Sequence, residues 1–192
     1  LTFEEITKLS ELEIPTRFKG MIKARDMFLF SFYTAGMRFS DICKLQWTNI
    51  LGNEIVYTMG KSRTRAGAKR TLPLTPKAIA ILERYKGKNN TYIFPPLYGM
   101  DAKDGGKIEY KLFIANNAIN RSLRNACKKA KIEKWVNMHM AKHSFADFAV
   151  KNDTGLLMIS KLLGHTKLST TQHYLKDFYH KEEAEEMNRL FG

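Results

Sequence analysis

The sequence predicts a mainly α-helical domain with a small antiparallel β-sheet, that is, an α+β fold. Apolar residues recur at helical spacing along most of the 192 residues, and a chain of this length can bury a proper core. Residues 53–59 and 69–74 have the pattern of strands, and the basic, glycine-bearing loop between them indicates a hairpin. We therefore expect a single domain over residues 1–192, with residues 181–192 as a tail helix.

The helices are predicted from their caps and from apolar spacing. Thr2 and Glu5 form a capping-box pattern that opens the first helix, and Pro76 suits the first position of a helix that reaches about residue 85. A turn at Ala35 and Gly36 separates a helix over 23–33 from one that ends near residue 46. The other expected elements are a short strand over 92–94, a loop over 97–107, and helices over 114–131, around His139, over 154–163 with Gly164 at its end, and from Ser169 onward.

The chain is strongly basic, with 32 Lys and Arg against 19 Asp and Glu and a net charge of +13. This excess favours nucleic acid as the partner, because neutralised phosphates release counterions and supply affinity without regard to sequence. A membrane-surface protein is the competing class, but no apolar run approaches the about 20 residues of a membrane span, and no signal peptide opens the chain. Cys43 and Cys127 are expected to be reduced core residues of a cytoplasmic, nucleoid-associated protein.

The segment HMAKHS, residues 139–144, is the strongest candidate for a site. At about 100° per residue, His139, Lys142 and His143 share one face of a helix, and the small Ala146 on that face leaves room for a ligand. The alternative without a functional role is a solvated basic face with a structural histidine. The opposite face is apolar and is expected to dock on the core through Ala141, Phe145, Phe148 and Ala149.

Four segments together resemble the tyrosine recombinase, or phage integrase, family. Residues 34–42, TAGMRFSDI, are similar to its first arginine motif, with Arg38 as the arginine. Lys61 in the hairpin, which LPL over residues 72–74 closes, is similar to its lysine hairpin. Residues 139–145 match its His-x-x-Arg-His box except at Lys142, and LLGH over residues 162–165, followed by Tyr174, matches its histidine and nucleophile segment. The resemblance extends over residues 1–178.

The resemblance implies the catalytic-domain fold of that family and a bacterial, mobile-element DNA strand transferase. Such an enzyme forms a covalent phosphotyrosine and needs neither a metal ion nor a nucleotide cofactor. Its catalytic residues would be Arg38, Lys61, His139, Lys142, His165 and Tyr174. Contacts to double-stranded DNA are expected from Arg63, Arg65, Lys69, Asn120, Arg121, Arg124, Lys128 and His143.

The residue types suit attack on a phosphodiester. A tyrosine hydroxyl is a poor nucleophile near neutral pH, so Tyr174 needs charge stabilisation and proton transfer. Arg38 can hold two non-bridging oxygens in a planar fork, and His165 can donate to a non-bridging oxygen as well. His139 can take the proton of the tyrosine hydroxyl or hold it through a hydrogen bond, and Lys61 can protonate the 5′-oxygen leaving group. The 3′-phosphotyrosine would conserve the bond energy for religation.

Lys142 leaves alternatives open, because an ammonium is a point charge and cannot make the bidentate contact of a guanidinium. One alternative is a DNA-binding relative with little or no cleavage, and another is a type IB topoisomerase with the same chemistry. A metallohydrolase is a third class, since His139 and His143 are spaced like a metal pair. Met140 disfavours it, because it stands where a zincin has its Glu.

Single residues also have competing interpretations. Arg38 could simply cap or pair with a helix, and Tyr179 competes with Tyr174, which is preferred for its spacing from His165. The cations Arg63, Arg65 and Lys69 compete with Lys61 in the same hairpin. The two tryptophans, Trp47 and Trp135, are expected in the core.

The resemblance further implies a homo-oligomer, a tetramer on paired sites, whose tail helix docks on or is exchanged with a neighbouring subunit. The tail has a narrow apolar stripe that suits this docking, formed by Ala184, Met187, Leu190 and Phe191. The family usually has an N-terminal DNA-clamping domain, which we expect to be absent from this chain. The sequence begins with Leu1 rather than Met, as a piece of a longer protein would.

Overall fold

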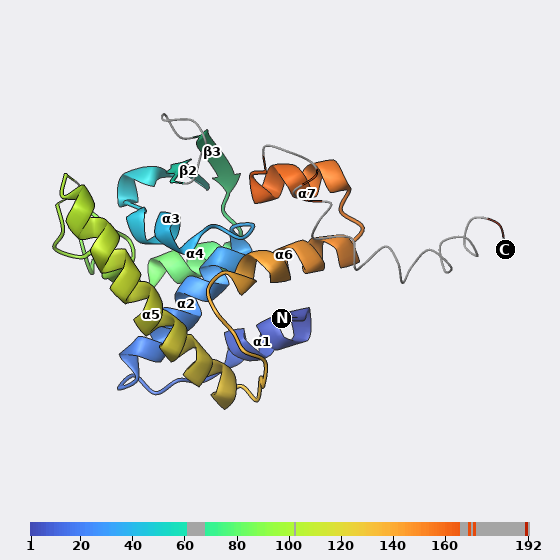
Figure 1. The fold of residues 1–192 in the computed structure, drawn as a ribbon, viewed down its shortest axis with the longest axis horizontal. Helices are drawn as coiled ribbons and strands as arrows, with labels where there is room; N and C mark the ends of the chain where they lie inside the picture. Colours follow the sequence, from blue (N-terminus) through green and yellow to red (C-terminus); the bar gives the residue numbers. More distant parts are fainter. Residues whose placement is uncertain (61–67, 102, 166–168, 170, 172–190, 192) are drawn as a thin grey trace.

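The computed structural model describes residues 1–60, 68–101, 103–165, 169, 171 and 191. Its helices surround a small antiparallel sheet (Figure 1), which confirms the predicted fold class. The helices are α1 (Phe3–Glu11), α2 (Lys19–Tyr33), α3 (Phe39–Lys44), α4 (Pro76–Glu83), α5 (Gly105–Lys129), α6 (Met140–Lys151) and α7 (Leu156–Leu163). The strands are β1 (Ile50–Leu51), β2 (Glu54–Met59) and β3 (Ala68–Pro73), and single 3₁₀ turns cover Trp47–Asn49 and Pro95–Leu97.

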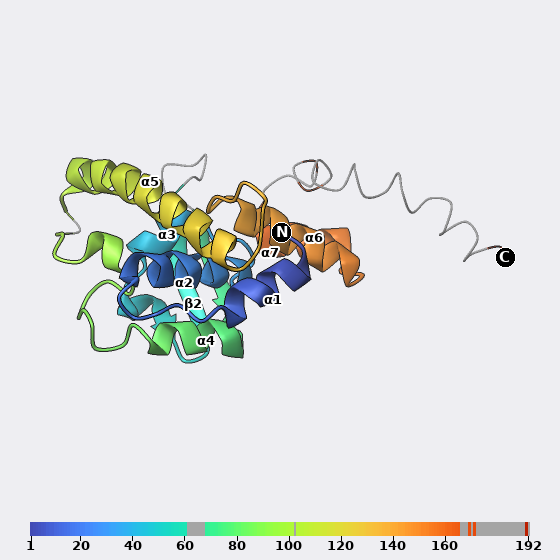
Figure 2. The same ribbon diagram turned by 90° about the horizontal axis from the view of Figure 1, so that it is seen from below.

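Helix α2 is central to the core. It packs against α5 on one side and α4 on the other, an arrangement that Figure 2 shows edge-on, and Phe28 and Phe30 are fully buried. The buried Asp26 is compensated by Arg25 and Arg84, whose guanidinium nitrogens lie 3.1 and 2.7 Å from its Oδ1. A buried charge is tolerated only when it is paired in this way. The helix therefore gives firm support to the residues that follow it.

The predicted starts of α1 and α4 are confirmed. Thr2 and Glu5 form the capping box, in which the Glu5 amide donates to Thr2 Oγ1 (3.3 Å) and the Thr2 amide donates to Glu5 Oε2 (2.8 Å). Thr75 caps α4 by accepting from the Ala78 amide at 3.2 Å, with Pro76 in the first turn. These side chains satisfy amides that have no partner inside the helix.

The sheet has the order β1-β2-β3, and the hairpin of β2 and β3 is confirmed. The prediction of a third strand over residues 92–94 is wrong, because the third strand of the sheet is β1, which pairs with β2. Tyr92 makes only an isolated bridge to Gln46. The pairing cannot continue, since the chain enters a 3₁₀ turn at Pro95 and proline has no amide to donate.

Two other boundaries differ from the prediction. Helix α5 begins at Gly105, nine residues before the predicted start at residue 114. It therefore includes the last residues of the loop predicted over 97–107. Ile108 and Leu112 are buried there, in line with Ile119 further along the helix, and this burial outweighs the weak helix propensity of the glycines. Helix α2 likewise begins at Lys19 rather than near residue 23.

Helix α6 packs between α2 and α7, and this corrects the predicted ligand-facing surface of the His139 helix. His139 and His143 are exposed, as expected, but Lys142 and Ala146 are buried. Ala146 forms a second small apolar cluster with residues of α7, namely Ile159 and Leu163. A helical wheel shows which residues share a face, but it does not show that a second helix covers that face.

Three further predictions can be compared with the structure. Cys43 and Cys127 are buried and free, as expected. Trp47 is partly buried against the core, whereas Trp135 is 73% exposed, so the prediction of a core tryptophan is wrong there. Within the described residues, no helix has both the length and the apolar character needed to cross a membrane. The expected helix from Ser169 and the tail over 181–192 lie almost wholly outside the described residues.

Candidate active site

A groove of about 730 Å³ lies between the start of α3, the exposed side of α5 and the start of α6. Arg38, His139 and Lys142 line it together with Gly60, the residue before the hairpin loop, and Asn116 of α5. The structure thus brings three of the six predicted catalytic residues to one hollow. Lys61 and Tyr174 lie outside the described residues, as do Arg63 and Arg65.

The turn before Arg38 is shaped for a close approach to α6. Ala35 and Gly36 both have positive φ, 56° and 73°, and the Gly36 amide donates to the Ser31 carbonyl at 2.8 Å. A Cβ on Gly36 would lie 2.7 Å from the Cα of Lys142, so only glycine fits there. The glycine of the motif therefore sets the spacing between the Arg38 turn and Lys142.

Arg38 precedes α3 and projects a guanidinium into the groove. Within the described residues, its Nη1 is buried and has no hydrogen-bond partner. A buried, unsatisfied donor on a permanent cation is costly unless an anion completes it. This nitrogen is the clearest sign that the groove receives a negatively charged group.

Lys142 lies beside Arg38 with its side chain buried. Its Nζ donates to the Leu163 carbonyl at the C-terminal end of α7, at 3.0 Å. Burial and the positive charges of Arg38 and Arg70 lower the pKa of Lys142 to about 8, against a smaller opposing effect of Asp41. One of the donors of this ammonium is thus already in use inside the protein.

His165 is held by the turn that ends α7. Gly164 takes the left-handed conformation, with φ 66°, and the His165 amide donates to the Ser160 carbonyl at 3.0 Å. His165 Nδ1 lies 2.8 Å from the Thr171 hydroxyl. Burial, Lys142, Arg38 and Arg70 lower the pKa of His165 to about 4, so the ring is neutral near pH 7. If Nδ1 accepts from Thr171, the ring proton is on Nε2 and can be donated to a ligand.

His139 lies at the start of α6, where asparagines organise the backbone. Asn137 Oδ1 accepts from the amides of His139 (3.0 Å) and Met140 (3.2 Å). Asn120 Oδ1 accepts from the Met138 amide at 2.8 Å. The structure therefore gives Asn120 a structural bond next to His139, in addition to its predicted contact with DNA. The ring of His139 meets that of His143 edge-on at 4.8 Å, and burial together with His139 and Lys142 lowers the pKa of His143.

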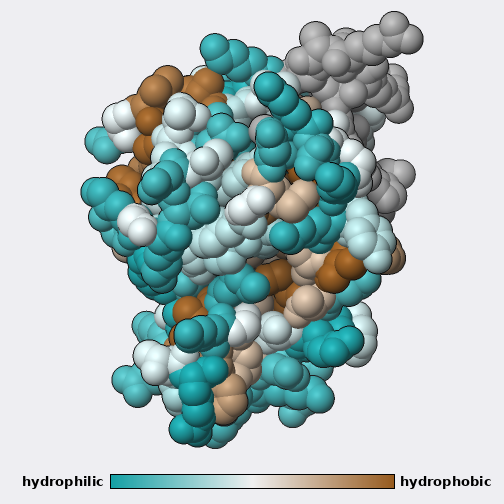
Figure 3. All heavy atoms as spheres, turned by 90° about the vertical axis from the view of Figure 1, so that its left-hand side faces the viewer, coloured by the Kyte–Doolittle hydropathy of each residue, from teal (hydrophilic) through white to brown (hydrophobic). Residues whose placement is uncertain are grey.

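The other predicted DNA-contacting residues follow α5 and β3. Arg121 is exposed, and the guanidinium of Arg124 lies 4.3 Å from the ring centre of the exposed Trp135. Lys69 is exposed on β3. The end of the molecule shown in Figure 3 is mostly hydrophilic, interrupted by hydrophobic patches. Exposed apolar side chains on α5 include Tyr110, Phe113 and Ile114.

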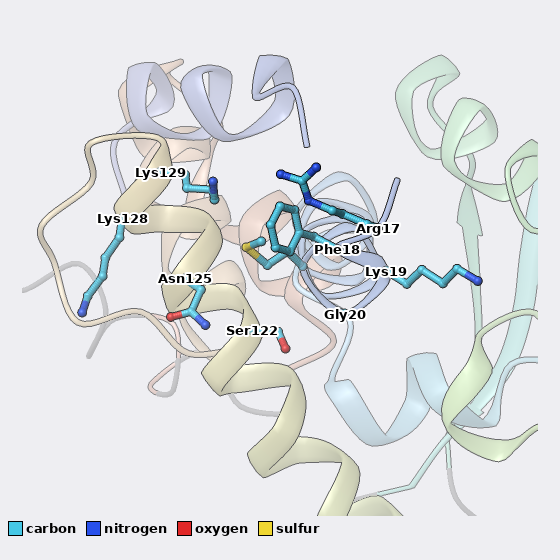
Figure 4. A pocket seen from close by; sticks show the side chains of 9 residues that line it. Arg17, Phe18, Lys19, Gly20, Ser122, Asn125, Lys128 and Lys129 are labelled. Atoms are coloured by element: carbon cyan, nitrogen blue, oxygen red, sulfur yellow. The ribbon is translucent and has the colours of Figure 1, made fainter. Parts of the chain in front are cut away.

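Lys128 lines a separate basic hollow of about 550 Å³, between the end of α5 and the start of α2 (Figure 4). Arg17, Lys19 and Lys129 line it too, and Arg17 and Lys129 lie 4.9 and 5.2 Å from the ring centre of Phe18. Among the described residues, none of these four cations has an ion-pair partner. This surface is therefore available to bind an anionic partner.

Two residues at the site were not predicted from the sequence. Asp41 is buried and its Oδ1 accepts from the Gly60 amide at 3.1 Å, which ties α3 to the base of the hairpin. Burial raises the pKa of Asp41. Arg70 lies on the inner side of β3, opposite Tyr57. Strand alternation could have predicted that Arg70 points inward, because it is two residues before the inward-facing Leu72 on the same strand.

Metal ligation was the basis of one alternative. Among the residues that the structure describes, no three His, Cys, Asp or Glu side chains come together as a metal site requires. His139 and His143 do lie ring to ring, but Lys142 between them in sequence is turned inward.

Comparison with known sequences identifies relatives over most of the chain. The profile of the Phage integrase family matches residues 1–181. Tyrosine recombinase XerC of Xanthomonas campestris pv. campestris (strain B100) is 30% identical over 176 residues, which cover 88% of this chain and 49% of the relative. A tyrosine recombinase of Thermosipho africanus (strain TCF52B) is 33% identical over 145 residues, which cover 74% of this chain and 46% of the relative. The chain spans about half the length of the relatives that it matches.

Comparison with solved structures establishes the fold. XerA recombinase superposes with a TM-score of 0.63 at 20% identity, over 95% of this chain and 62% of that one. XerH site-specific recombinase bound to difH substrate gives 0.63 at 17% identity, over 91% and 49%. The Tn1549 transposon integrase in complex with circular intermediate DNA gives 0.63 at 20% identity, over 99% and 66%. By its sequence and its fold, the chain belongs to the phage integrase family of tyrosine recombinases.

Proposed function

We propose that this chain is the catalytic domain of a site-specific DNA recombinase or integrase. Tyr174 attacks the scissile phosphate and forms a 3′-phosphotyrosyl intermediate. A second 5′-hydroxyl then attacks this intermediate, which re-forms a phosphodiester and releases the tyrosine. The observation that supports this most strongly is Nη1 of Arg38, which is buried in a groove beside Lys142 and His139 and has no hydrogen-bond partner among the residues that the structure describes. A phosphate oxygen is the acceptor that such a guanidinium lacks.

The groove supplies positive charge where the reaction develops negative charge. Arg38 binds non-bridging oxygens of the phosphate, and its second nitrogen fixes their orientation. The neutral His165 donates from Nε2 to a non-bridging oxygen, without releasing a proton to water. Nη1 of Arg38 and the side chain of Lys142 are buried, so solvent screens their charges less, and they stabilise the negative charge that develops in the five-coordinate transition state.

Proton transfers complete the reaction. His139 at the open mouth of the groove takes the proton of the Tyr174 hydroxyl as the O–P bond forms. Lys61 on the hairpin gives a proton to the departing 5′-oxygen as the P–O bond breaks. Religation runs the same steps in reverse, so the phosphodiester energy is conserved and no nucleotide cofactor is used.

The DNA backbone runs along the basic face that α5 and the hairpin form. Arg121 and Arg124 of α5 contact phosphates on one side of the groove, and Lys69, Arg63 and Arg65 contact them on the other. Lys128 contacts a more distant phosphate from the hollow around Phe18. His143 adds a contact beside His139. The net charge of +13 and the cations around Phe18, which form no ion pair within the described part of the chain, support such a footprint, because each neutralised phosphate releases counterions.

The assembly follows from the same proposal. Residues 1–192 form one catalytic domain. Four copies act on paired sites, and the tail over 181–192 docks its apolar stripe on its own domain or on another copy. The protein works on the nucleoid in the cytoplasm of a bacterium.

A DNA-binding protein with little cleavage is the second candidate. The hydrogen bond from Lys142 to the Leu163 carbonyl favours this candidate, since it uses one of the N–H donors of the ammonium that would otherwise bind the phosphate. A type IB topoisomerase remains an alternative for the same chemistry. It would relax supercoiled DNA without a paired site, which a plasmid relaxation assay measures directly.

The test is a covalent adduct on a nicked, suicide duplex that contains the recombination site. Tyr174→Phe should abolish the adduct and leave DNA affinity nearly unchanged, because it removes one hydroxyl and no charge. Tyr179→Phe is the matched control and should retain the adduct. An adduct that survives Tyr174→Phe would show that another residue is the nucleophile.

A further inference from the structure

Arg70 connects the hairpin to the turn that holds His165. The register of the sheet pairs Arg70 with Tyr57, which places both side chains on the inner side of the hairpin. Arg70 Nη1 donates to the Tyr57 hydroxyl at 3.3 Å, and Tyr57 is itself buried. A planar guanidinium bonded to a buried, inflexible group has a fixed orientation. Arg70 is thus anchored on the side of the sheet.

The other edge of the guanidinium meets α7. Arg70 Nη2 lies 3.5 Å from the Lys161 carbonyl, in the last turn of the helix. Packing against Gly164 is closer still, since a Cβ on that glycine would lie 2.9 Å from Arg70 Nη1 and 3.2 Å from Cζ. The residue directly before His165 therefore rests on the guanidinium of Arg70.

Two cations meet the C-terminal end of α7. Arg70 approaches the Lys161 carbonyl, and Lys142 Nζ donates to the Leu163 carbonyl at 3.0 Å. Positive charge at this end of a helix is stabilising, because the last carbonyls have no partner inside the helix and the helix dipole is negative there. The two cations come from β3 and α6, so the end of α7 is held from two sides.

We propose that Arg70 is a positioning residue of the active site, which holds the Gly164 turn so that His165 faces the scissile phosphate. The proposal rests on the function proposed above, in which His165 acts on that phosphate. It adds a residue outside the motif that defines the site, and it gives β3 a role besides carrying the hairpin.

The electrostatic surroundings of His165 agree with this arrangement. Together with burial, the charges of Lys142, Arg38 and Arg70 lower the pKa of His165. Arg70 also lowers the pKa of Lys142 and opposes the rise in the pKa of Asp41. One guanidinium thus acts on groups from α3, α6 and the end of α7.

The experiment compares Arg70→Lys and Arg70→Gln with Lys86→Gln. Lys86 follows α4, and Figure 2 shows α4 and α5 on opposite sides of α2. Among the described residues, Lys86 forms an ion pair only with the exposed Glu83, at 3.4 Å. Lys86→Gln therefore removes one positive charge far from the groove. Arg70→Lys keeps the charge but cannot span the distance from Tyr57 to Lys161 with a planar fork.

The first readout needs no DNA. Amide hydrogen exchange at Gly164 and His165 should accelerate about ten-fold or more in both Arg70 variants, because their turn loses its support, and should not change in Lys86→Gln. The pKa of His165, followed by NMR, should rise in Arg70→Gln and stay low in Arg70→Lys. Unchanged exchange in both Arg70 variants would overturn the proposal.

The second readout is adduct formation at saturating duplex, measured in the unsubstituted chain and in a Lys142→Arg background. We expect Arg70→Lys to lower the rate about ten-fold while DNA affinity changes much less. A rate equal to that of Arg70 would mean that only charge matters, which overturns the positioning role. If no variant or background forms an adduct, the proposed function fails, whereas the exchange measurement still decides the role of Arg70.

Discussion

At position 142, an ammonium occupies a place where the family pattern has a guanidinium. Lys142 uses a donor on the Leu163 carbonyl and is buried beside Arg38. A guanidinium has more donors in a fixed plane, so it could keep the contact with α7 and still bind the phosphate. In the proposed mechanism, Lys142 therefore divides its donors between the support of the Gly164 turn and the phosphate.

The substitution Lys142→Arg should increase single-turnover cleavage by ten-fold or more, with little change in DNA affinity. Loss of one oriented donor to a developing oxyanion costs on the order of 10²–10³ in rate, or roughly 3–4 kcal/mol. Charge attraction in the ground state is the same for both residues. Adduct formation on a suicide duplex measures the rate, and equal rates would mean that Lys142 substitutes fully.

The pH dependence should differ between these two proteins. Lys142 is a base whose pKa is lowered to about 8 by burial and by Arg38 and Arg70, so its ammonium is present below this pH and is lost as the pH rises above it. Arginine stays charged throughout. At subsaturating DNA, the rate of the Lys142 protein relative to that of Lys142→Arg should therefore fall as the pH rises through about 8. A ratio that is constant with pH would contradict titration of Lys142 in this range.

Among the structural elements, the ends of helices set the geometry of the groove. The Gly36 turn after α2 brings Arg38 to α6, and the Gly164 turn after α7 presents His165. Asn137 organises the start of α6, next to His139. Each catalytic candidate that the structure describes thus lies at an element's end, where backbone groups are free to be fixed by side chains.

The substitution Gly164→Ala should impair both stability and cleavage. A left-handed φ costs a non-glycine residue roughly 1–2 kcal/mol, and here the added Cβ would also lie 2.9 Å from Arg70 Nη1. Gly87→Ala is the matched control, because Gly87 has φ 76° and nothing within 4 Å of an added Cβ. Chemical denaturation should give similar losses of stability from backbone strain, and only Gly164→Ala should slow adduct formation. A slow adduct in both variants would attribute the effect to stability alone.

For the whole molecule, charge is the dominant property. The groove, the exposed side of α5 and the hollow around Phe18 all present cations. Helix α4 lies on the opposite side of α2 from α5 (Figure 2). An extended polyanion can contact several of these places at once. Electrostatics thus favours a duplex over a small anion as the partner of this surface.

Affinity for duplex DNA should fall steeply with salt. Several phosphate contacts give a slope of several units in a log–log plot, at about 0.9 per contact. The triple substitution of Arg17, Lys128 and Lys129 by Gln should flatten the slope, whereas Lys86→Gln, on the far side, should not. Fluorescence anisotropy over a salt series measures this, and a flat response of the unsubstituted protein would contradict the electrostatic footprint.

Local patterns in the sequence were sufficient to predict several elements. The capping box of Thr2 and Glu5, the Thr75 cap and the hairpin of β2 and β3 depend on residues close together in the chain, so spacing alone specifies them. The same holds for Gly164, whose left-handed turn ends α7. Helical spacing selected His139 and Lys142, the resemblance to the family selected Arg38, and the structure places all three in one groove.

Tertiary packing decided the rest. The sequence gives the faces of α6 but not its neighbours, so only the fold shows that α7 covers Lys142 and Ala146. Trp135 is exposed over Arg124 although Ile132 and Val136 on either side of it are buried, and no local pattern specifies which of these residues faces outward. Arg70 reaches Gly164 across 94 positions of sequence. Contacts between distant segments depend on how the core packs, and they decide which charges surround the phosphate site.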